Sequence, residues 1–432
     1  MKRTWALLAC AVLATSLAAC TSGTGVAGSG QIDTDSTTAG PATPGDKTAG
    51  TSTDPGTSTS AGTSSSAGTS SSAGTSSSAA DATLASMLTM VPASVAGDQP
   101  VTINLYWKAA AAGGVTVPGA DATLADQSKY SLALTNSLET GIGMAGSDLL
   151  FQLSQRATAQ GQPIAASDIA ADIQASAPPR IAIAARGSFD TSTIDQAFRS
   201  NSNWKDELTT PDYRGHTFYR WMDDLKMDIT KRYTGLFTEL GSSRRMAFPD
   251  SSTFLFGRVD ATMHALLDVG NDPAPSLAAD TNYRAVATAL DDHGVYSALI
   301  VGPQLLAPLV GSSTSSPEQA KKVLAELRKH ALKPYVLAGI GETIVDGTPR
   351  TVIVLANSDD DAARANADAL RGLVTGGKSA VRQQPWSDFY AIESISTDGA
   401  VTIGVLTLTD PARVTAWSRA VYNRDTLLAM SN

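Results

Sequence analysis

Cysteine is nearly absent from this sequence. Its 432 residues contain only Cys10 and Cys20, both close to the start. The long remainder therefore has no disulfide crosslink, no cysteine-based metal site and no thiol nucleophile. It has to be stabilised by its own hydrophobic core, which a chain of this length can supply.

Clusters of lysine and arginine are also missing, and the formal net charge is −9. An acidic chain without a basic run is not expected to bind nucleic acid or to dock its body on an anionic membrane surface. The four histidines, His216, His264, His293 and His330, form no pair with metal-ligand spacing, and no G-x-S-x-G motif marks a nucleophilic serine. We predict no metal, no cofactor and no catalytic residue, although a Ser-His-Asp triad assembled from distant positions stays open.

What the sequence does contain at its start is a secretory signal pattern. Lys2 and Arg3 precede an almost wholly small or apolar run over residues 5–19. This run is shorter than the roughly 20 apolar residues that a membrane-spanning helix needs, so it predicts a cleaved signal peptide. We therefore expect residues 1–19 to be removed from the mature protein.

The end of the run, Leu17-Ala18-Ala19-Cys20, resembles the lipobox of bacterial lipoproteins. In that family the chain is cut before the cysteine, here between Ala19 and Cys20, and the thiol carries a diacylglycerol. The alternative is an ordinary signal peptide followed by a chance cysteine. The resemblance implies a lipid-anchored protein at the extracytoplasmic face of the cell membrane, with the bilayer as one partner.

The segment after Cys20 has the composition of a spacer. Residues 21–80 consist mainly of Ser, Thr, Gly, Ala and Pro, and the hexad GTSSSA begins at Gly62, Gly68 and Gly74. With almost no large apolar side chains, the segment cannot bury enough surface to offset the entropy of ordering. Residues 20–80 therefore predict a lipidated cysteine followed by a disordered tether with an r.m.s. span of roughly 40–45 Å. O-glycosylation of the tether stays open.

The body after residue 80 has mixed helix and strand patterns. Asp-Gly pairs at 346–347 and 398–399 each separate two alternating apolar runs, which is typical of β-hairpins. Acidic residues begin, and glycine ends, a helical pattern over 358–377. Further patterns predict strands at 100–107, 180–187, 213–221, 252–259 and 295–302. They predict helices at 81–95, 191–201, 221–230, 260–270, 283–292 and 316–332. The stretch 120–175 is expected to be mostly helical.

The order of these elements predicts an α+β fold. Residues 295–397 run strand, helix, strand, strand, helix, strand, which is the order of a ferredoxin-like βαββαβ unit, and residues 180–302 can be given the same order. We therefore predict two related ferredoxin-like lobes with antiparallel-rich sheets, an N-terminal lobe at 81–302 and a C-terminal lobe at 303–432. A single irregular α+β body is the alternative.

A second resemblance covers residues 85–302. The stretches ARGSFDTSTIDQAF, YRGHTFYRW, ATMHALLDVG and PSLAADTNYRAVATAL resemble those of secreted actinobacterial proteins of unassigned function. This resemblance implies no substrate and no catalytic residue.

Two motifs suggest chemistry. GIGMAG (141–146) matches the G-x-G-x-x-G pattern that cradles a pyrophosphate, but no hydrophobic strand precedes it, so a glycine-rich break between helices is expected. On the predicted helix 221–230, Asp224 and Asp228 lie one turn apart, as in an acid/base pair or a Ca²⁺ site. No calcium-loop pattern supports this, and an exposed acidic face is favoured.

The densest aromatic and methionine composition lies in residues 198–237. It includes Trp204, Tyr219, Trp221 and Met222, which suit either the lining of an apolar cleft between the lobes or the core.

The function that fits these features is that of a non-catalytic cell-envelope lipoprotein whose body binds a partner protein or a hydrophobic envelope molecule. The alternatives are a solute-binding lipoprotein of a transporter, which usually has two lobes with parallel strands, and a cell-wall hydrolase, which needs a histidine clustered with serine and carboxylate.

Overall fold

A computed structural model describes the chain from residue 81. The gaps within the described part are residues 98, 120–121, 136–139, 147–148, 151–152, 154–162, 178–179, 203–205, 232–240, 274, 307–317, 319–324, 326–328, 330, 411–412 and 431–432. The predicted signal peptide, Ala19, Cys20, the tether and most of the predicted helix 316–332 lie outside the described residues. Residues Ser76–Asn432 form one compact unit.

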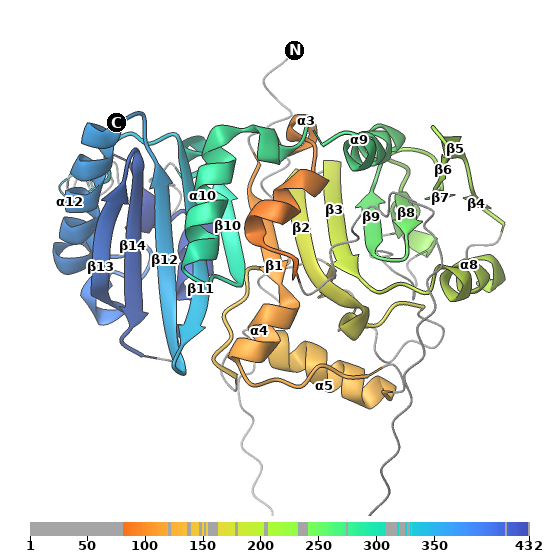
Figure 1. The fold of residues 1–432 in the computed structure, drawn as a ribbon, viewed down its shortest axis with the longest axis horizontal. Coiled ribbons are helices and arrows are strands. Elements are labelled where there is room, and N and C mark those ends of the chain that lie inside the picture. The colour runs from red at the N-terminus through yellow and green to blue at the C-terminus, as the bar shows by residue number, and fades with distance from the viewer. Residues whose placement is uncertain are drawn as a thin grey trace, which may run out of the picture. The chain divides into compact units, whose positions relative to one another are not determined.

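The centre of this unit is a 12-stranded sheet (Figure 1). Its strands run in the order β13-β14-β12-β11-β10-β1-β2-β3-β9-β8-β7-β4, and all neighbouring pairs are antiparallel. The strands are β1 (Val101–Leu105), β2 (Ile169–Ala177), β3 (Arg180–Gly187), β4 (Leu208–Thr209), β7 (Tyr219–Trp221), β8 (Arg244–Asp250), β9 (Thr253–Gly257), β10 (Ser297–Val301), β11 (Leu337–Val345), β12 (Thr348–Ala356), β13 (Tyr390–Asp398) and β14 (Val401–Leu408).

The prediction of an α+β fold rich in antiparallel strands is confirmed, but two ferredoxin-like lobes are not. From β10 onward each strand pairs with its sheet neighbour in the order β10-β11-β12-β14-β13. A ferredoxin-like unit would instead bring its first strand beside a parallel third one. The sheet is also continuous across the predicted boundary at residue 302, because β10 pairs with β11 there.

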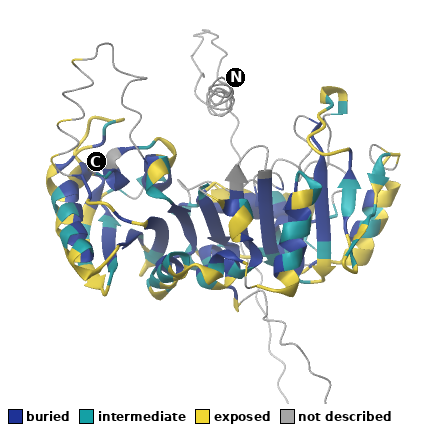
Figure 2. Ribbon diagram, turned by 90° about the horizontal axis from the view of Figure 1, so that it is seen from above, coloured by how far each residue is buried: buried dark blue, intermediate teal, exposed yellow. Residues whose placement is uncertain are grey.

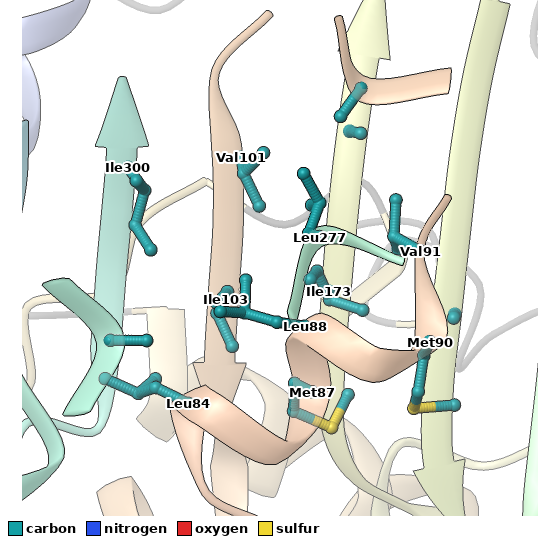
Figure 3. Packing of buried hydrophobic residues seen from close by; sticks show 14 of the residues in the cluster. Leu84, Met87, Leu88, Met90, Val91, Val101, Ile103, Ile173, Leu277 and Ile300 are labelled. Carbon is teal, nitrogen blue, oxygen red and sulfur yellow. The ribbon is translucent and has the colours of Figure 1, made fainter. Parts of the chain in front are cut away.

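One face of the sheet is covered by four helices that lie between residues 84 and 292. They are α2 (Leu84–Met87), α3 (Ala93–Ala96), α9 (Asp260–Asn271) and α10 (Thr281–Asp292). Figure 3 shows Leu84, Met87 and Leu88 packed over Ile103 and Ile173 of the two central strands. This first core group extends from Ala247 on β8 to Ile403 on β14, so a single hydrophobic layer runs across nearly the whole sheet.

The opposite face carries two separate core groups. The second core group lies under α4 (Tyr106–Ala112), α5 (Leu124–Thr135) and α8 (Thr191–Ser200). The third lies under α12 (Asp360–Gly376) and α13 (Ala416–Tyr422). With both faces covered, the central strands are buried throughout (Figure 2).

Several local predictions are confirmed. Both Asp-Gly hairpins are present, as β11–β12 and β13–β14, and Asp346 and Gly347 have positive φ values of 51° and 72°. The carboxylate of Asp190 caps α8 by accepting from the amides of Ser192 and Thr193.

Other local predictions are wrong. The stretch 120–175 contains strand β2 in addition to helix α5. The segment 213–221 is not one strand: it turns at Arg214-Gly215 to form the hairpin β5 (Asp212–Tyr213) and β6 (His216–Thr217) before β7 begins. The turn is possible because both turn residues have positive φ values, 53° and 83°.

Candidate functional site

The loop between β7 and β8 is the first feature that suggests a site. Residues 222–231, which we call the apolar loop, overlap the helix that the sequence predicts over 221–230. The structure corrects this: Met222 and Leu225 have positive φ values of 64° and 60°, and only Ile229–Lys231 form a short 3₁₀ turn. Positive φ values are incompatible with a right-handed helix and strain any side chain other than glycine.

Three large apolar side chains of this loop face solvent. Leu225 is 59 % exposed, Met227 58 % and Ile229 60 %. Scattered exposed apolar residues are normal on a protein surface, but three within five residues form a local apolar cluster of the kind that marks interaction sites. The polar residues Lys226 and Asp228 alternate with them.

The backbone of the apolar loop is held in place by residues 241–243, which directly precede β8. Met227 forms a β-bridge with Ser242, the amide of Asp228 donates to the carbonyl of Gly241 (2.9 Å), and the amide of Ser243 donates to the carbonyl of Lys226 (2.9 Å). Gly241 has a φ of 59°, and a Cβ there would overlap the carbonyl of Asp228. The exposed side chains are therefore presented on a defined backbone.

A buried arginine on β8 anchors the base of the loop. The Arg245 side chain is 1 % exposed and forms salt bridges with Asp224 of the loop and with Asp260, the first residue of α9. Its guanidinium also donates to the carbonyl of Met222 (3.0 Å). Asp224 further accepts from the amide of Asp260 (3.0 Å), so these charges join loop, strand and helix.

Of the residues predicted to line an apolar cleft, Tyr219 and Trp221 on β7 lie directly before this loop and Met222 is its first residue. Trp204 lies outside the described residues. Trp221 and Met222 are buried in the second core group, and Tyr219 is half-buried against Phe198 of α8. Burial, together with donation of its hydroxyl to Asp195 (2.8 Å), raises the pKa of Tyr219. The cleft itself stays a prediction.

Sequence reasoning found the region but missed the exposed cluster within it. The signal was present as the alternation Leu225, Met227, Ile229, which is strand-like. The spacing of Asp224 and Asp228 directed the interpretation toward a helix instead. In the structure these two carboxylates are used separately: Asp224 pairs with Arg245, and Asp228 accepts from the amide and hydroxyl of Thr230.

A second feature is a row of buried polar side chains across the middle of the sheet. Asp172 on β2, Asn104 on β1, Ser297 on β10 and Glu342 on β11 are direct partners in the strand register, and each is 0 % exposed. We call these four residues the polar row. Neighbouring residues on their strands belong to the first core group, so the row points to the opposite face of the sheet.

The polar row is internally hydrogen bonded. Asn104 donates to Asp172 (3.0 Å) and accepts from the hydroxyl of Ser297 (2.7 Å). Glu342 accepts from the Tyr296 hydroxyl (3.1 Å) and from the indole N–H of Trp417 on α13 (2.8 Å). Burying polar groups in this way requires such partners, because an unpaired buried polar group costs about 1–3 kcal/mol.

The described histidines do not assemble a hydrolytic site. His264 stacks on Tyr213 with ring centroids 3.8 Å apart, His216 contacts the Asn271 side-chain oxygen (3.2 Å), and Nδ1 of His293 lies 2.9 Å from the carbonyl of Ala289. His330 lies outside the described residues. Within the described ranges no group of three or more His, Cys, Asp or Glu side chains is placed to hold a metal ion. Nor does any described helix have the length and apolarity that crossing a membrane requires.

Comparisons with known proteins add little. No family model and no curated protein matches the chain. Among solved structures, crystal forms I, III and IV of a protein named TP0453 match, with TM-scores of 0.32, 0.34 and 0.35 and identities of 9 %, 9 % and 10 %. The matches cover 78 %, 77 % and 76 % of this chain and 96 % of TP0453. A similarity at this level carries no argument about function.

Proposed function

We propose that this chain is a lipid-anchored, non-catalytic protein of the extracytoplasmic face of the cell membrane, whose body binds a partner protein through the apolar loop. The observation that carries the binding part is the exposure of Leu225, Met227 and Ile229 on a clamped backbone. The location rests on the signal pattern, the lipobox ending at Cys20 and the tether composition of residues 21–80.

The clamped backbone favours a protein surface as the binding partner. A loop already held in its binding conformation avoids much of the ordering entropy that association otherwise costs. Methionine is common at such surfaces, since its flexible side chain adapts its shape to an apolar groove. The strained φ values at Met222 and Leu225 add support, because strain of this kind, about 1–3 kcal/mol per residue, concentrates at functional sites.

The charges favour a partner protein over lipid. The formal net charge of −9 opposes approach to an anionic bilayer, and the apolar loop itself carries three aspartates against two lysines. A groove of apolar residues with lysine or arginine at its rim complements this arrangement. A transporter solute-binding protein receives less support, because every described strand pair of the sheet is antiparallel.

The loop prediction is tested with the variant L225S/M227S/I229S in the full chain. We expect its thermal unfolding to stay unchanged, since all three side chains are already mostly exposed, and its affinity for the partner to fall about tenfold or more. The partner is first identified by photo-crosslinking from position 227. Its affinity for the purified protein is then measured by calorimetry.

The matched control is Val381→Ser, because Val381 is a large apolar residue, 55 % exposed, outside the loop. Equal loss of binding in both variants would contradict the proposal. So would binding of the C20S chain to zwitterionic or anionic lipid vesicles that the triple serine substitution abolishes, because the loop would then be a lipid-binding element.

Anchoring is tested separately by Cys20→Ser. A serine hydroxyl cannot form the thioether to diacylglycerol, so the variant is expected to move from the detergent phase to the aqueous phase in Triton X-114 partition. Mass spectrometry of the wild type should show a chain that begins at Cys20 and carries the acyl mass. An unmodified wild-type cysteine would contradict the anchor without affecting the loop proposal.

A further inference from the structure

The glycine-rich segment GIGMAG, residues 141–146, lies over the polar row. We call it the strap. Its Ile142 belongs to the second core group and its Ala145 to the third. The strap therefore crosses the boundary between the two core groups on this face of the sheet, and it does so where the row of polar side chains separates them.

Two amides of the strap bind the polar row directly. The amide of Gly143 donates to Oε1 of Glu342 (3.1 Å), and the amide of Ala145 donates to Oγ of Ser297 (2.7 Å). A Cβ on Gly143 would overlap the Glu342 carboxyl group and the carbonyl of Val414. The close approach of backbone to carboxyl thus requires glycine at this position.

Glu342 is surrounded by uncharged donors. Its hydrogen-bond partners are Gly143, the hydroxyl of Tyr296 and the indole of Trp417, and none of them carries a positive charge. Across the register on β12 it faces Thr351. A buried carboxylate without a cation is costly, because neutral donors replace only part of its hydration.

Charged and titratable groups on the surrounding elements do not change this picture. Tyr296 and Tyr390 both titrate near Glu342, and the interaction of each with Glu342 is repulsive when both groups are ionised. Asp172, at the other end of the polar row, is a second buried carboxylate, and the charges of Arg382 and Asp425 act on Tyr390. Lys108 on α4 donates to the carbonyl of Val295, and its electrostatic partner is Asp291. On β12, Arg350 pairs with Glu393, and Arg419 on α13 is exposed.

We propose that the strap is a pH-dependent cover of the sheet, which is closed while Glu342 is protonated and opens when Glu342 ionises. Opening would hydrate the carboxyl group and release the amides of Gly143 and Ala145 together. This device is independent of the apolar loop and of its partner.

The direction of the pH dependence follows from the environment of the Glu342 carboxyl group. Burial raises the pKa of Glu342 well above its ordinary value of 4.5 in the closed state, and the hydrogen bonds from Tyr296, Gly143 and Trp417 oppose this only in part. In the open, hydrated state the pKa returns toward 4.5. Above that pH the open state loses a proton that the closed state keeps, so rising pH favours opening up to the closed-state pKa.

The test is hydrogen exchange of the full chain in detergent between pH 5 and pH 8. After correction for intrinsic exchange, the opening constant measured at Gly143 and Ala145 is expected to rise about tenfold per pH unit, the slope for one proton, until it reaches a plateau. Amides of Val352 and Ile353 in β12 should show no such slope. Glu342→Gln should remove the slope at the strap, because an amide side chain does not titrate.

The control variant is Glu393→Gln, a half-exposed carboxylate on β13 that should leave the slope in place. A flat or falling opening constant in the wild type would overturn the proposal, and so would a slope that persists in Glu342→Gln. If Glu342→Gln does not fold, infrared difference spectra of the wild type decide. If the band of a protonated carboxyl group disappears over the same pH range in which strap exchange rises, the proposal is supported. If no such band is present at pH 5, the proposal is refuted.

Discussion

Replacing Arg245 with methionine is expected to lower the free energy of unfolding by about 3 kcal/mol. The guanidinium is buried and joins Asp224, Asp260 and the carbonyl of Met222, so its removal leaves these groups without their shared donor. The value lies at the low end for a broken buried ion pair because Asp224 and Asp260 are 44 % and 30 % exposed and can be hydrated. Urea denaturation followed by circular dichroism measures it.

The apolar loop should respond to the same substitution. Without Arg245 the loop loses its attachment to β8 and α9, so proteolysis near Leu225 is expected to accelerate more than global unfolding does. The matched control is Arg199→Met, because Arg199 on α8 pairs with Asp195 at a largely exposed site and should contribute little. Equal destabilisation by both substitutions would show that Arg245 does not anchor the loop.

Truncation of Trp221 to alanine has the second large expected effect, a loss of about 3–5 kcal/mol in unfolding free energy. Trp221 is 1 % exposed, lies within the second core group, and carries the guanidinium of Arg244 over its ring at 4.3 Å. Alanine would leave a cavity and remove the surface on which that cation rests. Chemical denaturation of the full chain measures the change.

The same substitution separates the two interpretations of Trp221. A tryptophan in a solvent-filled cleft would lose little stability on truncation, so a change below about 1 kcal/mol would favour the cleft over the core. Trp221→Phe serves as the control, because it keeps an aromatic ring under Arg244 and should recover much of the loss.

The local elements that sequence predicted well have causes within a few residues. The two Asp-Gly turns require only a pair of residues with positive φ between alternating runs, and Asp190 caps the helix that immediately follows it. Helix α12 likewise begins with acidic residues and ends beside Gly377. Such signals depend on local backbone conformation, so they can be recognised from a few neighbouring residues without knowledge of the rest of the chain.

The elements that sequence missed depend on distant partners. β8 begins with Arg244 and Arg245, two charges that suit a strand interior only because Trp221, Asp224 and Asp260 converge on them. Glu342 follows an apolar run and gives no sign that it faces inward. Neither the polar row nor its cover can be predicted before the register of β1, β10 and β11 is known.

The position of β1 also sets the order in which this protein can fold. β1 lies between β2 and β10, and its Val101 pairs with Ile300 about 200 residues later in the chain, a separation that slows folding. Until residues 297–301 are present, one side of a fully buried strand has no neighbour. A chain that is still being synthesised therefore carries an open edge on β1 while about 200 further residues are added, which is a state in which holding chaperones protect proteins from aggregation.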